Sequence, residues 1–173
     1  IMEAMNAECC QNFAGPKHTL VDFHRMMTRL VEMEDSQYSY RNVLAAYTSG
    51  GILAGICVAY DGGKLHQLRR RFYEAALEAF GIDYTGMTDE TEDGEFYIDS
   101  LAVSSNFRGK GIASQLLQAT IERGAEFGIP TVGLLVDKGN PKAEALYQRL
   151  GFVYVNDSTW GGHPMRHLQY KHD

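Results

Sequence analysis

The amino-acid sequence predicts an α/β fold in which a mixed sheet is flanked by helices. The first observation is an apolar run, a segment with helical spacing and a second apolar run in succession, as in a parallel βαβ crossover. The second is a pair of short apolar runs, "NVLAAYT" and "ILAGICVAY", which Ser49-Gly50-Gly51 joins as a glycine turn joins two strands. The third is the presence of segments with the helical period before and after this pair.

The part of the chain before these two strands is predicted to form two helices. Residues 1–13 have helix-forming side chains, and Gly15-Pro16 supplies the stop. Thr19 offers an N-cap to a second helix, whose apolar residues recur near the helical period as far as Val31. Two helices are therefore expected before the first clear strand.

A third helix and a loop precede the crossover. Residues 64–80 return to helical spacing, and the basic run Arg69–Arg71 is predicted to be the solvated face of that helix. The acidic stretch Asp89–Glu95 is predicted to be an ordinary solvated loop, although it could also steer a cationic amine towards a cleft. It leads into the strand "FYIDSLAV", which ends at Val103.

The rest of the chain completes the crossover and adds a helix and two strands. Gly128 and Pro130 end the crossover helix, and the following strand is apolar on both faces, as a strand covered on both sides should be. The expected elements are, in chain order, a helix over 111–127, a strand over 131–136, a short helix over 141–150 and strands over 152–155 and 167–170.

Length and composition indicate one domain. The chain has 173 residues, of which 45% are hydrophobic and 22% charged, as is usual for a globular protein. A domain of this size buries about 70% of the surface that its unfolded chain exposes, so residues 1–173 are predicted to form a single domain. Because the sequence begins with Ile1, we expect that an upstream stretch, including a first strand, could be missing.

Net charge and cysteine content restrict the classes of partner and metal site that we expect. The formal net charge of −6 argues against nucleic acid or a membrane surface as partner, because binding them needs a basic face. There is neither an apolar stretch of about 18 residues nor a signal-peptide pattern. Three cysteines suggest neither a disulfide framework nor a zinc site. We therefore expect a cytoplasmic monomer or homodimer without a metal.

The stretch between the strand at Val103 and the helix at Gly111 is predicted to bind an anion. The first N–H groups of a helix have no intrahelical partner and lie at the positive end of its dipole. Gly109 and Gly111 allow close backbone approach, and Arg108 and Lys110 add positive charge. Two better-known phosphate loops do not fit. A P-loop fails because Lys110 is followed by Gly111, and a dinucleotide fingerprint from Gly109 fails at Ser114.

Two motifs in this region resemble one known family. "RGKGIA" (108–113), behind the strand residues "LAV", fits the pattern Gln/Arg-x-x-Gly-x-Gly/Ala. Downstream, "NPKAEALYQRLGF" begins a helix with Asn140 as N-cap and Pro141 at the first helical position. Both motifs, in this order, are similar to those of the GNAT superfamily of acyl-CoA-dependent N-acetyltransferases. The resemblance is specific over residues 95–152.

The resemblance implies the GNAT fold, with a mostly antiparallel mixed sheet and one parallel βαβ crossover. It also implies acetyl-CoA as cosubstrate, and direct acetyl transfer in a ternary complex to a primary amine of a small molecule or peptide. The residues that it places around acetyl-CoA are Leu101, Ala102, Val103, Arg108, Gly109, Lys110, Gly111, Ile112, Ala113, Ser114, Asn140 and Ala143.

The resemblance also suggests Tyr147 as the catalytic acid. Tyrosine has a pKa of about 10 and a thiol one of about 8.5, so Tyr147 is protonated at neutral pH and able to protonate the leaving thiolate. Its alternative role is packing, since it lies at core spacing in its helix and could contact Phe152 beyond Gly151.

For the general base, Asp99 is the candidate. It lies two residues before Leu101, so strand alternation predicts that both side chains share one face with Tyr97 and Glu95. An Asp in an apolar strand is costly unless it is paired, and a structural, hydrogen-bonded role is an equal alternative. His163 is predicted to be a turn residue rather than a group near the acceptor, and Cys57 a core residue.

Two other functions fit the same motifs. One is a non-catalytic acyl-CoA-binding module that regulates a partner protein. The other is an acyltransferase with a different acyl donor or an O-acyl acceptor, because a phosphate site makes no contact with the acyl group. Tyr147 favours an enzyme over the binding module.

Overall fold

The computed structural model describes residues 1–172, which form a six-stranded sheet in the order β1-β2-β3-β4-β6-β5. Four neighbouring pairs are antiparallel, and β3 and β4 form the parallel pair. The predicted mixed, mostly antiparallel sheet is confirmed. The strands are β1 (Val43–Tyr47), β2 (Leu53–Asp61), β3 (Phe96–Val103), β4 (Thr131–Asp137), β5 (Val153–Trp160) and β6 (His163–Lys171).

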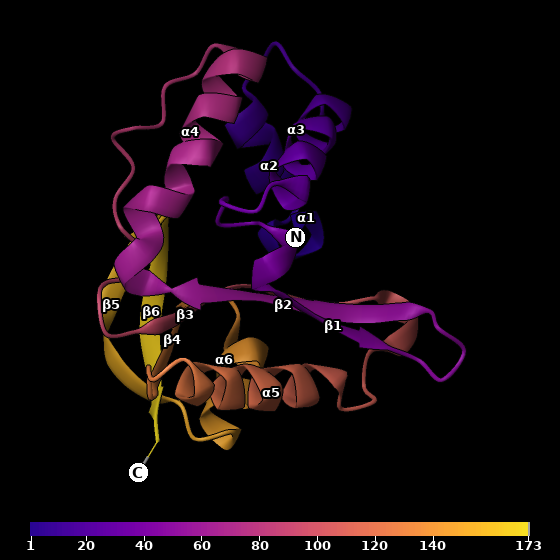
Figure 1. Cartoon of the computed structure of the whole chain (residues 1–173), viewed down its shortest axis with the longest axis vertical. Helices are drawn as coiled ribbons and strands as arrows, with labels where there is room; N and C mark the ends of the chain where they lie inside the picture. The colour runs from indigo at the N-terminus through magenta and orange to yellow at the C-terminus, as the bar shows by residue number, and fades with distance from the viewer. Residues whose placement is uncertain (173) are drawn as a thin grey trace.

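Helices cover both faces of this sheet. Four lie on one face and two on the other, and α5 crosses between the parallel strands β3 and β4 (Figure 1). None of the helices within residues 1–172 is long and apolar enough to cross a membrane. The helices are α1 (Met2–Met5), α2 (Ala7–Ala14), α3 (Leu20–Glu32), α4 (Leu65–Phe80), α5 (Ile112–Glu126) and α6 (Pro141–Arg149), with short 3₁₀ turns at Tyr40–Asn42, Gly62–Lys64 and Ser105–Phe107.

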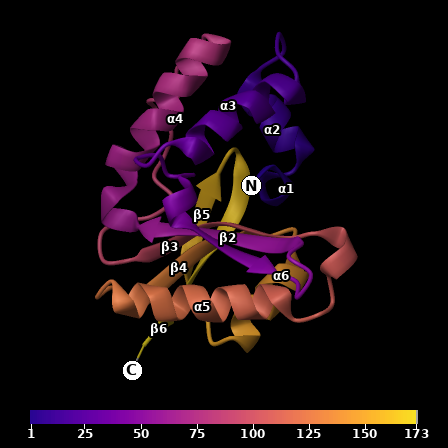
Figure 2. The same cartoon turned by 45° about the vertical axis from the view of Figure 1, so that its right-hand side comes forward.

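Each face of the sheet has its own apolar core. Side chains of α1 to α4 form one core, which the far end of β5 joins because the Trp160 ring lies 5.7 Å from that of Phe13. Figure 2 shows β5 and β6 rising towards these helices. The second core lies between the sheet and the pair α5 and α6, and includes Leu117, Leu134 and Phe152.

The N-terminal helix predicted over residues 1–13 is wrong in one respect, because the chain breaks it at Asn6. Asn6 has φ 68, a backbone conformation that no helix contains, and separates α1 from α2. Its side-chain oxygen accepts a hydrogen bond from the Cys9 N–H at 2.9 Å. Asn6 therefore acts as the N-cap of α2. The predicted N-cap at Thr19 is confirmed, with a full capping box completed by Asp22.

The basic run in α4 is not a solvated face throughout. Arg69 is buried, with 1% of its side chain exposed, and pairs with Glu90 at 2.7 Å. Arg70 and Arg71 remain on the surface and pair with Glu74. The prediction failed because the partner of Arg69 comes from the acidic loop, which folds back over α4 and buries Glu90 as well.

Glu95 is buried at the end of the same loop. Its carboxylate lies 2.6 Å from His167 Nε2 and accepts hydrogen bonds from Gln169 and Thr91. It sits directly over Gly133 of β4, where a Cβ atom would collide with the carboxylate. The loop predicted to be solvated therefore contributes two buried acids, Glu90 and Glu95, to the fold.

We expect Gly133→Ala to lower the free energy of unfolding by roughly 1–3 kcal/mol, because the added methyl group displaces a buried, hydrogen-bonded carboxylate. Urea denaturation followed by circular dichroism measures the change. Gly86→Ala is the control, because a Cβ at Gly86 meets no atom within 4 Å. Equal stability of the two variants would contradict the packing role of Gly133.

Candidate active site

The two parallel strands stop pairing midway. Residues Phe96–Ile98 of β3 pair with Val132–Leu134 of β4, and beyond them each strand keeps only its antiparallel neighbour. We call the unpaired ends, Asp99–Val103 of β3 and Leu135–Asp137 of β4, the β3–β4 fork. Backbone groups alternate along a strand, and the Ser104 N–H bonds to Ala54 of β2, so the open edge of β3 offers the backbone groups of Leu101 and Val103, whereas those of Ala102 face β2.

The loop after β3 leads directly into the N-terminus of α5. Gly109 and Gly111 have φ values of 75° and 78°, which glycine adopts without strain. Gly111 is the N-cap residue of α5, and no side chain caps the helix. The N–H groups of Ile112, Ala113 and Ser114 are therefore available to an anion at the positive end of the helix dipole.

Arg108 and Lys110 bring positive charge to the same loop. Both are exposed. Arg108 Nε donates a hydrogen bond to the Val103 carbonyl at 3.1 Å, which ties the loop to the end of β3. Lys110 Nζ lies 5.2 Å from the centre of the Phe107 ring. A Cβ at Gly109 or Gly111 would meet no protein atom within 4 Å, so the space above the loop is open. These features fit the pyrophosphate of a coenzyme A.

Asn140 and Ala143 lie at the start of α6, on the other side of the fork. The Asn140 side-chain oxygen accepts a hydrogen bond from the Ala143 N–H at 3.2 Å. Asn140 thus uses its oxygen to cap its own helix, and its NH₂ group remains to donate to a ligand. The Ala143 N–H is already occupied, which leaves its side chain, packed against the second core, for contact.

Tyr147 lies on the α5 and α6 face of the sheet. Its ring packs edge-on against Phe152 with centroids 6.0 Å apart, so the packing role considered above is real. Burial raises the pKa of Tyr147 to about 12, with a smaller contribution from the nearby Cys57. Cys57 itself is buried in β2, as predicted, opposite Leu101 of the fork. The Tyr147 hydroxyl is therefore protonated at neutral pH and close to the fork.

Asp99 lies on the opposite face, and the prediction that it shares a face with Leu101 is wrong. Val58 pairs with Ser100 and Ala59 with Ile98, so the register skips Asp99 in a β-bulge. The bulge reverses the alternation. Leu101 packs in the core under α5, whereas the Asp99 carboxylate points towards the four-helix face.

The contacts of Asp99 are all polar. Its carboxylate accepts hydrogen bonds from Tyr60 Oη at 3.0 Å, Gln37 Nε2 at 3.1 Å and Ser100 Oγ at 2.8 Å. Burial raises the pKa of Asp99 above its ordinary value, and the three hydrogen bonds oppose this rise. These contacts give Asp99 a structural role, and its catalytic role stays a prediction.

Sequence reasoning missed the residues that surround Asp99. Gln37, Tyr60, Arg69 and Glu90 come from four separate segments and are all buried. The only sequence signal was an acidic loop together with an arginine on an otherwise apolar helix face. Pairing between them could not be anticipated from spacing.

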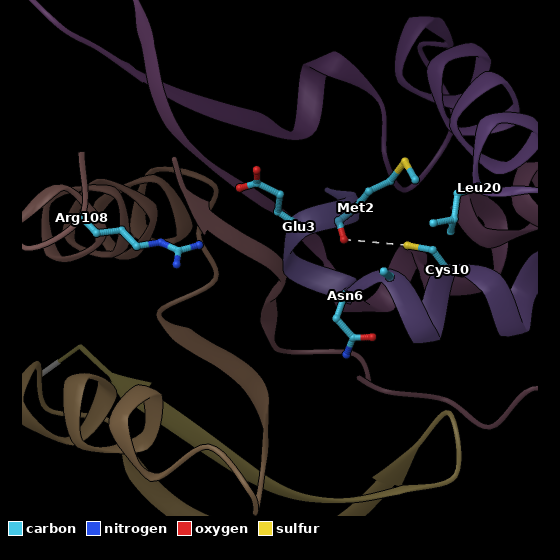
Figure 3. Close-up of a pocket in the computed structure, with 7 residues that line it drawn as sticks. Met2, Glu3, Asn6, Cys10, Leu20 and Arg108 are labelled. Carbon is cyan, nitrogen blue, oxygen red and sulfur yellow. Dashed lines mark hydrogen bonds between the residues drawn. The ribbon is translucent and has the colours of Figure 1, made fainter. Parts of the chain in front are cut away.

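A pocket of about 410 Å³ opens beside the loop Arg108–Gly111, which we call the anion loop. Figure 3 shows Arg108 on one side of it, facing Glu3 of α1 and Asn6, the N-cap residue of α2. Met2, Cys10 and Leu20 complete an apolar wall, and the Cys10 thiol lies 3.8 Å from the Met2 carbonyl oxygen. The helices α1 and α2 and the start of α3 thus border the site.

His163 contacts the end of the fork. It is the first residue of β6, follows the Gly161-Gly162 turn and has Nδ1 at 3.6 Å from the Asp137 carboxylate. Within residues 1–172, no group of three His, Cys, Asp or Glu side chains is arranged to hold a metal ion.

The comparison with protein families gives one match. The model of the acetyltransferase (GNAT) family matches residues 21–152. Among curated proteins, mycothiol acetyltransferase of Propionibacterium freudenreichii is 35% identical over 78 residues, which are 44% of this chain and 24% of that protein. The chain covers 24%, 35% and 60% of the length of three curated relatives.

Solved structures agree with the fold. One crystal structure of an acetyltransferase has a TM-score of 0.75 and 28% sequence identity, and the match covers 90% of this chain and 82% of that one. A Bacillus subtilis acetyltransferase in complex with CoA has a TM-score of 0.51 at 19% identity, over 75% of each chain.

Proposed function

Because the chain belongs to the GNAT family of acetyltransferases, we propose that residues 1–173 form one domain that transfers an acetyl group from acetyl-CoA to a primary amine. The amine belongs to a small molecule or a peptide. The observation that carries the proposal is the β3–β4 fork, which has an open anion site at one end, Tyr147 on one face and Asp99 on the other.

Cosubstrate binding is assigned to the fork and its two flanking helices. The free N–H groups at the start of α5, together with Arg108 and Lys110, would hold the pyrophosphate. The open edge of β3 from Leu101 to Val103 and the Asn140 amide would hold the pantetheine arm. When bound, acetyl-CoA supplies the thioester that the amine attacks.

The protons then move between the acceptor and two side chains. Asp99 takes a proton from the ammonium of the acceptor, directly or through one water, which leaves the nitrogen lone pair free to form the new C–N bond. A backbone N–H of β3 at the fork stabilises the negative charge that develops on the carbonyl oxygen. As the C–S bond breaks, Tyr147 donates its proton to the thiolate, and the proton that the attacking nitrogen loses as the amide forms restores the Tyr147 hydroxyl through solvent. No covalent enzyme intermediate is needed.

The acceptor is assigned to the pocket on the four-helix side. At about 410 Å³ this pocket has the size of a small-molecule site. It borders α1, which packs against β3 on the face that carries the Asp99 carboxylate. Glu3 gives one side of it a negative charge that suits a cationic amine, and Arg108 lies on the other side, towards the pyrophosphate.

The proposal is tested by incubating the protein with acetyl-CoA and a panel of amines, amino acids, polyamines and peptides. Thiol release and product mass are the readouts, and propionyl-CoA and succinyl-CoA are run beside acetyl-CoA. We expect turnover with acetyl-CoA and at least one primary amine. Binding of acetyl-CoA without turnover on the panel would favour a regulatory acyl-CoA-binding module. Faster turnover with another donor, or with alcohols as acceptors, would identify an acyltransferase with a different donor or an O-acyl acceptor.

We expect Asp99→Asn to lower kcat/KM at neutral pH by roughly 10- to 100-fold, because an amide cannot accept the proton. The loss should shrink as the pH rises, since more of the amine is then deprotonated in solution. The pH profile of kcat/KM measures both effects. Asp83→Asn, at an exposed loop residue that contacts Thr85, is the control. An unchanged profile for Asp99→Asn would remove it from the chemistry.

A further inference from the structure

A second buried carboxyl group lies close behind Asp99. The Tyr60 hydroxyl oxygen is 3.0 Å from Asp99 Oδ2 and 3.5 Å from Glu90 Oε1, so one hydroxyl bridges two carboxyl groups. The other Glu90 oxygen accepts a hydrogen bond from Arg69 at 2.7 Å. Both carboxyl groups are buried, and Glu90 is the more enclosed residue, with 6% of its surface exposed.

Hydrogen counting shows what this bridge requires. A tyrosine hydroxyl has a single hydrogen and can donate to only one of the two carboxyl groups. The shorter distance assigns that hydrogen to Asp99. Glu90 then contributes a hydrogen bond to the Tyr60 oxygen only if Glu90 itself carries a proton. Both hydrogen bonds of the Tyr60 oxygen can therefore form when Glu90 is protonated and Asp99 is ionised.

The charges around the pair agree with a single shared proton. Two buried carboxyl groups have one buried guanidinium, Arg69, as counter-charge, and Arg69 also pairs with the half-exposed Asp89 at 3.2 Å. Burial raises the pKa of Glu90 to about 7, the negative charge of Asp99 adds to this rise, and the positive charge of Arg69 opposes it. Like charges this close in a buried site cannot both be ionised without cost.

The other titratable groups near the pair are either neutral or the same in all variants. Burial and the two acids raise the pKa of Tyr38, Tyr60 and Tyr97 well above the ordinary value, so these hydroxyls stay protonated. The Cys57 thiol, whose pKa burial raises, also lies near Asp99. It is left unchanged in the experiments below.

We propose that Asp99 and Glu90 share one proton through the Tyr60 hydroxyl, with Glu90 keeping it so that Asp99 meets the acceptor ionised. The role of Asp99 rests on the proposed function. Transfer from Glu90 to Asp99 breaks the Glu90 O–H bond, forms an O–H bond on the Tyr60 oxygen and moves the original Tyr60 proton to Asp99. The total charge does not change. Glu90 and Tyr60 are thus positioning residues, which act on the acceptor only through Asp99.

A small cavity next to the pair supports a polar function for this cluster. It has a volume of about 10 Å³, the space of a single water molecule, and is lined in part by Gln37, Arg69 and Glu90. Across residues 1–172, the two buried side-chain atoms without a hydrogen-bond partner are Gln37 Oε1 and Arg69 Nε. Both belong to this lining, so a water there would complete the hydrogen bonding around Glu90.

The test compares the acid limb of the kcat/KM profile in two variants. Glu90→Gln keeps a neutral hydrogen-bond donor where the proposal has a protonated Glu90, so the limb should stay in place. Tyr60→Phe removes a donor to ionised Asp99, so the limb should move up by about one pH unit. A permanently ionised Glu90 would instead give a downward shift in Glu90→Gln, because a negative charge near Asp99 would then be lost.

Matched controls exist for both variants. Glu144 is another buried glutamate paired with an arginine, Arg166, at 2.6 Å, and Tyr84 is a tyrosine whose hydroxyl donates to a backbone carbonyl. Glu144→Gln and Tyr84→Phe should leave the acid limb in place. A downward shift in Glu90→Gln, or no shift in Tyr60→Phe, would overturn the shared proton.

A second readout needs neither substrate nor activity. Infrared difference spectra of the free protein should show a protonated carboxyl band at neutral pH, which titrates away as the pH rises. The band should be lost in Glu90→Gln, move to lower pH in Asp99→Asn and persist in Glu144→Gln. If Asp99→Asn retains full activity while the band behaves as stated, the proposed base fails and the shared proton stands. Absence of the band in the wild-type protein overturns the shared proton, whatever the activity of Asp99→Asn.

Discussion

Acetyl-CoA is expected to give no increase in melting temperature for Gly111→Val, whereas the wild-type protein should be stabilised by about 2.7 kcal/mol at a concentration of 100 Kd. Gly111 is the N-cap residue of α5 with φ 78, and its missing Cβ leaves the N–H groups of the helix open to a pyrophosphate. A valine side chain would project into the space that the ligand needs, and its β-branched carbon is strained at this φ. A thermal shift assay with increasing acetyl-CoA measures the loss.

Gly128→Val is the control, because it introduces the same backbone strain at a position outside the anion site. Gly128 lies at the other end of α5 with φ 75, and a Cβ there also meets no atom within 4 Å. Gly128→Val should therefore lower the melting temperature of the free protein as Gly111→Val does, yet keep the full response to acetyl-CoA. A full response in Gly111→Val would refute the anion site at the start of α5.

Tyr147→Phe is expected to lower kcat by roughly 10²- to 10³-fold while leaving the affinity for acetyl-CoA nearly unchanged, because the ring and its packing on Phe152 remain. With the pKa of Tyr147 raised to about 12, its hydroxyl stays protonated over the ordinary assay range. The wild-type rate should therefore show no loss of the acid on the alkaline side of neutral pH. Steady-state kinetics and calorimetric titration with acetyl-CoA separate the two quantities.

The control for Tyr147 is the other tyrosine that packs against Phe152. The Tyr170 ring lies 5.9 Å from that of Phe152, on β6. Tyr170→Phe should retain the wild-type kcat, since its hydroxyl takes no part in the proposed transfer. An unchanged kcat in Tyr147→Phe would assign Tyr147 to packing alone, which is the role that its helical spacing also allows.

Local signals in the sequence predicted the elements and the glycine turn before α5 well. Caps, stops and glycines act within a few residues, so Thr19, Asn140 and the Gly109–Gly111 loop have the positions expected of them. The continuous helix over 1–13 failed because the competing cap at Asn6 was not weighed. That signal was present in the sequence, since Asn is among the preferred N-cap residues.

Contacts between distant segments were beyond the reach of the sequence. Asp99 was assigned to the wrong face because alternation assumes a regular strand, and the bulge depends on how β3 pairs with β2. Arg69 was assigned to the surface because its partner, Glu90, reaches it only after the acidic loop closes over α4. In both cases the free energy that decides the side chain's place comes from a segment far away in the chain.

Hydrophobic periodicity and backbone freedom are properties of neighbouring residues, so the mixed sheet, the βαβ crossover and the glycine junction can be predicted before any tertiary contact is known. The parting of β3 and β4 at Asp99, the placement of Tyr147 and Asp99 on opposite faces and the position of Glu90 behind Asp99 depend on long-range packing. Register, burial and the sharing of one hydroxyl by two carboxyl groups exist only once residues from separate elements are packed together.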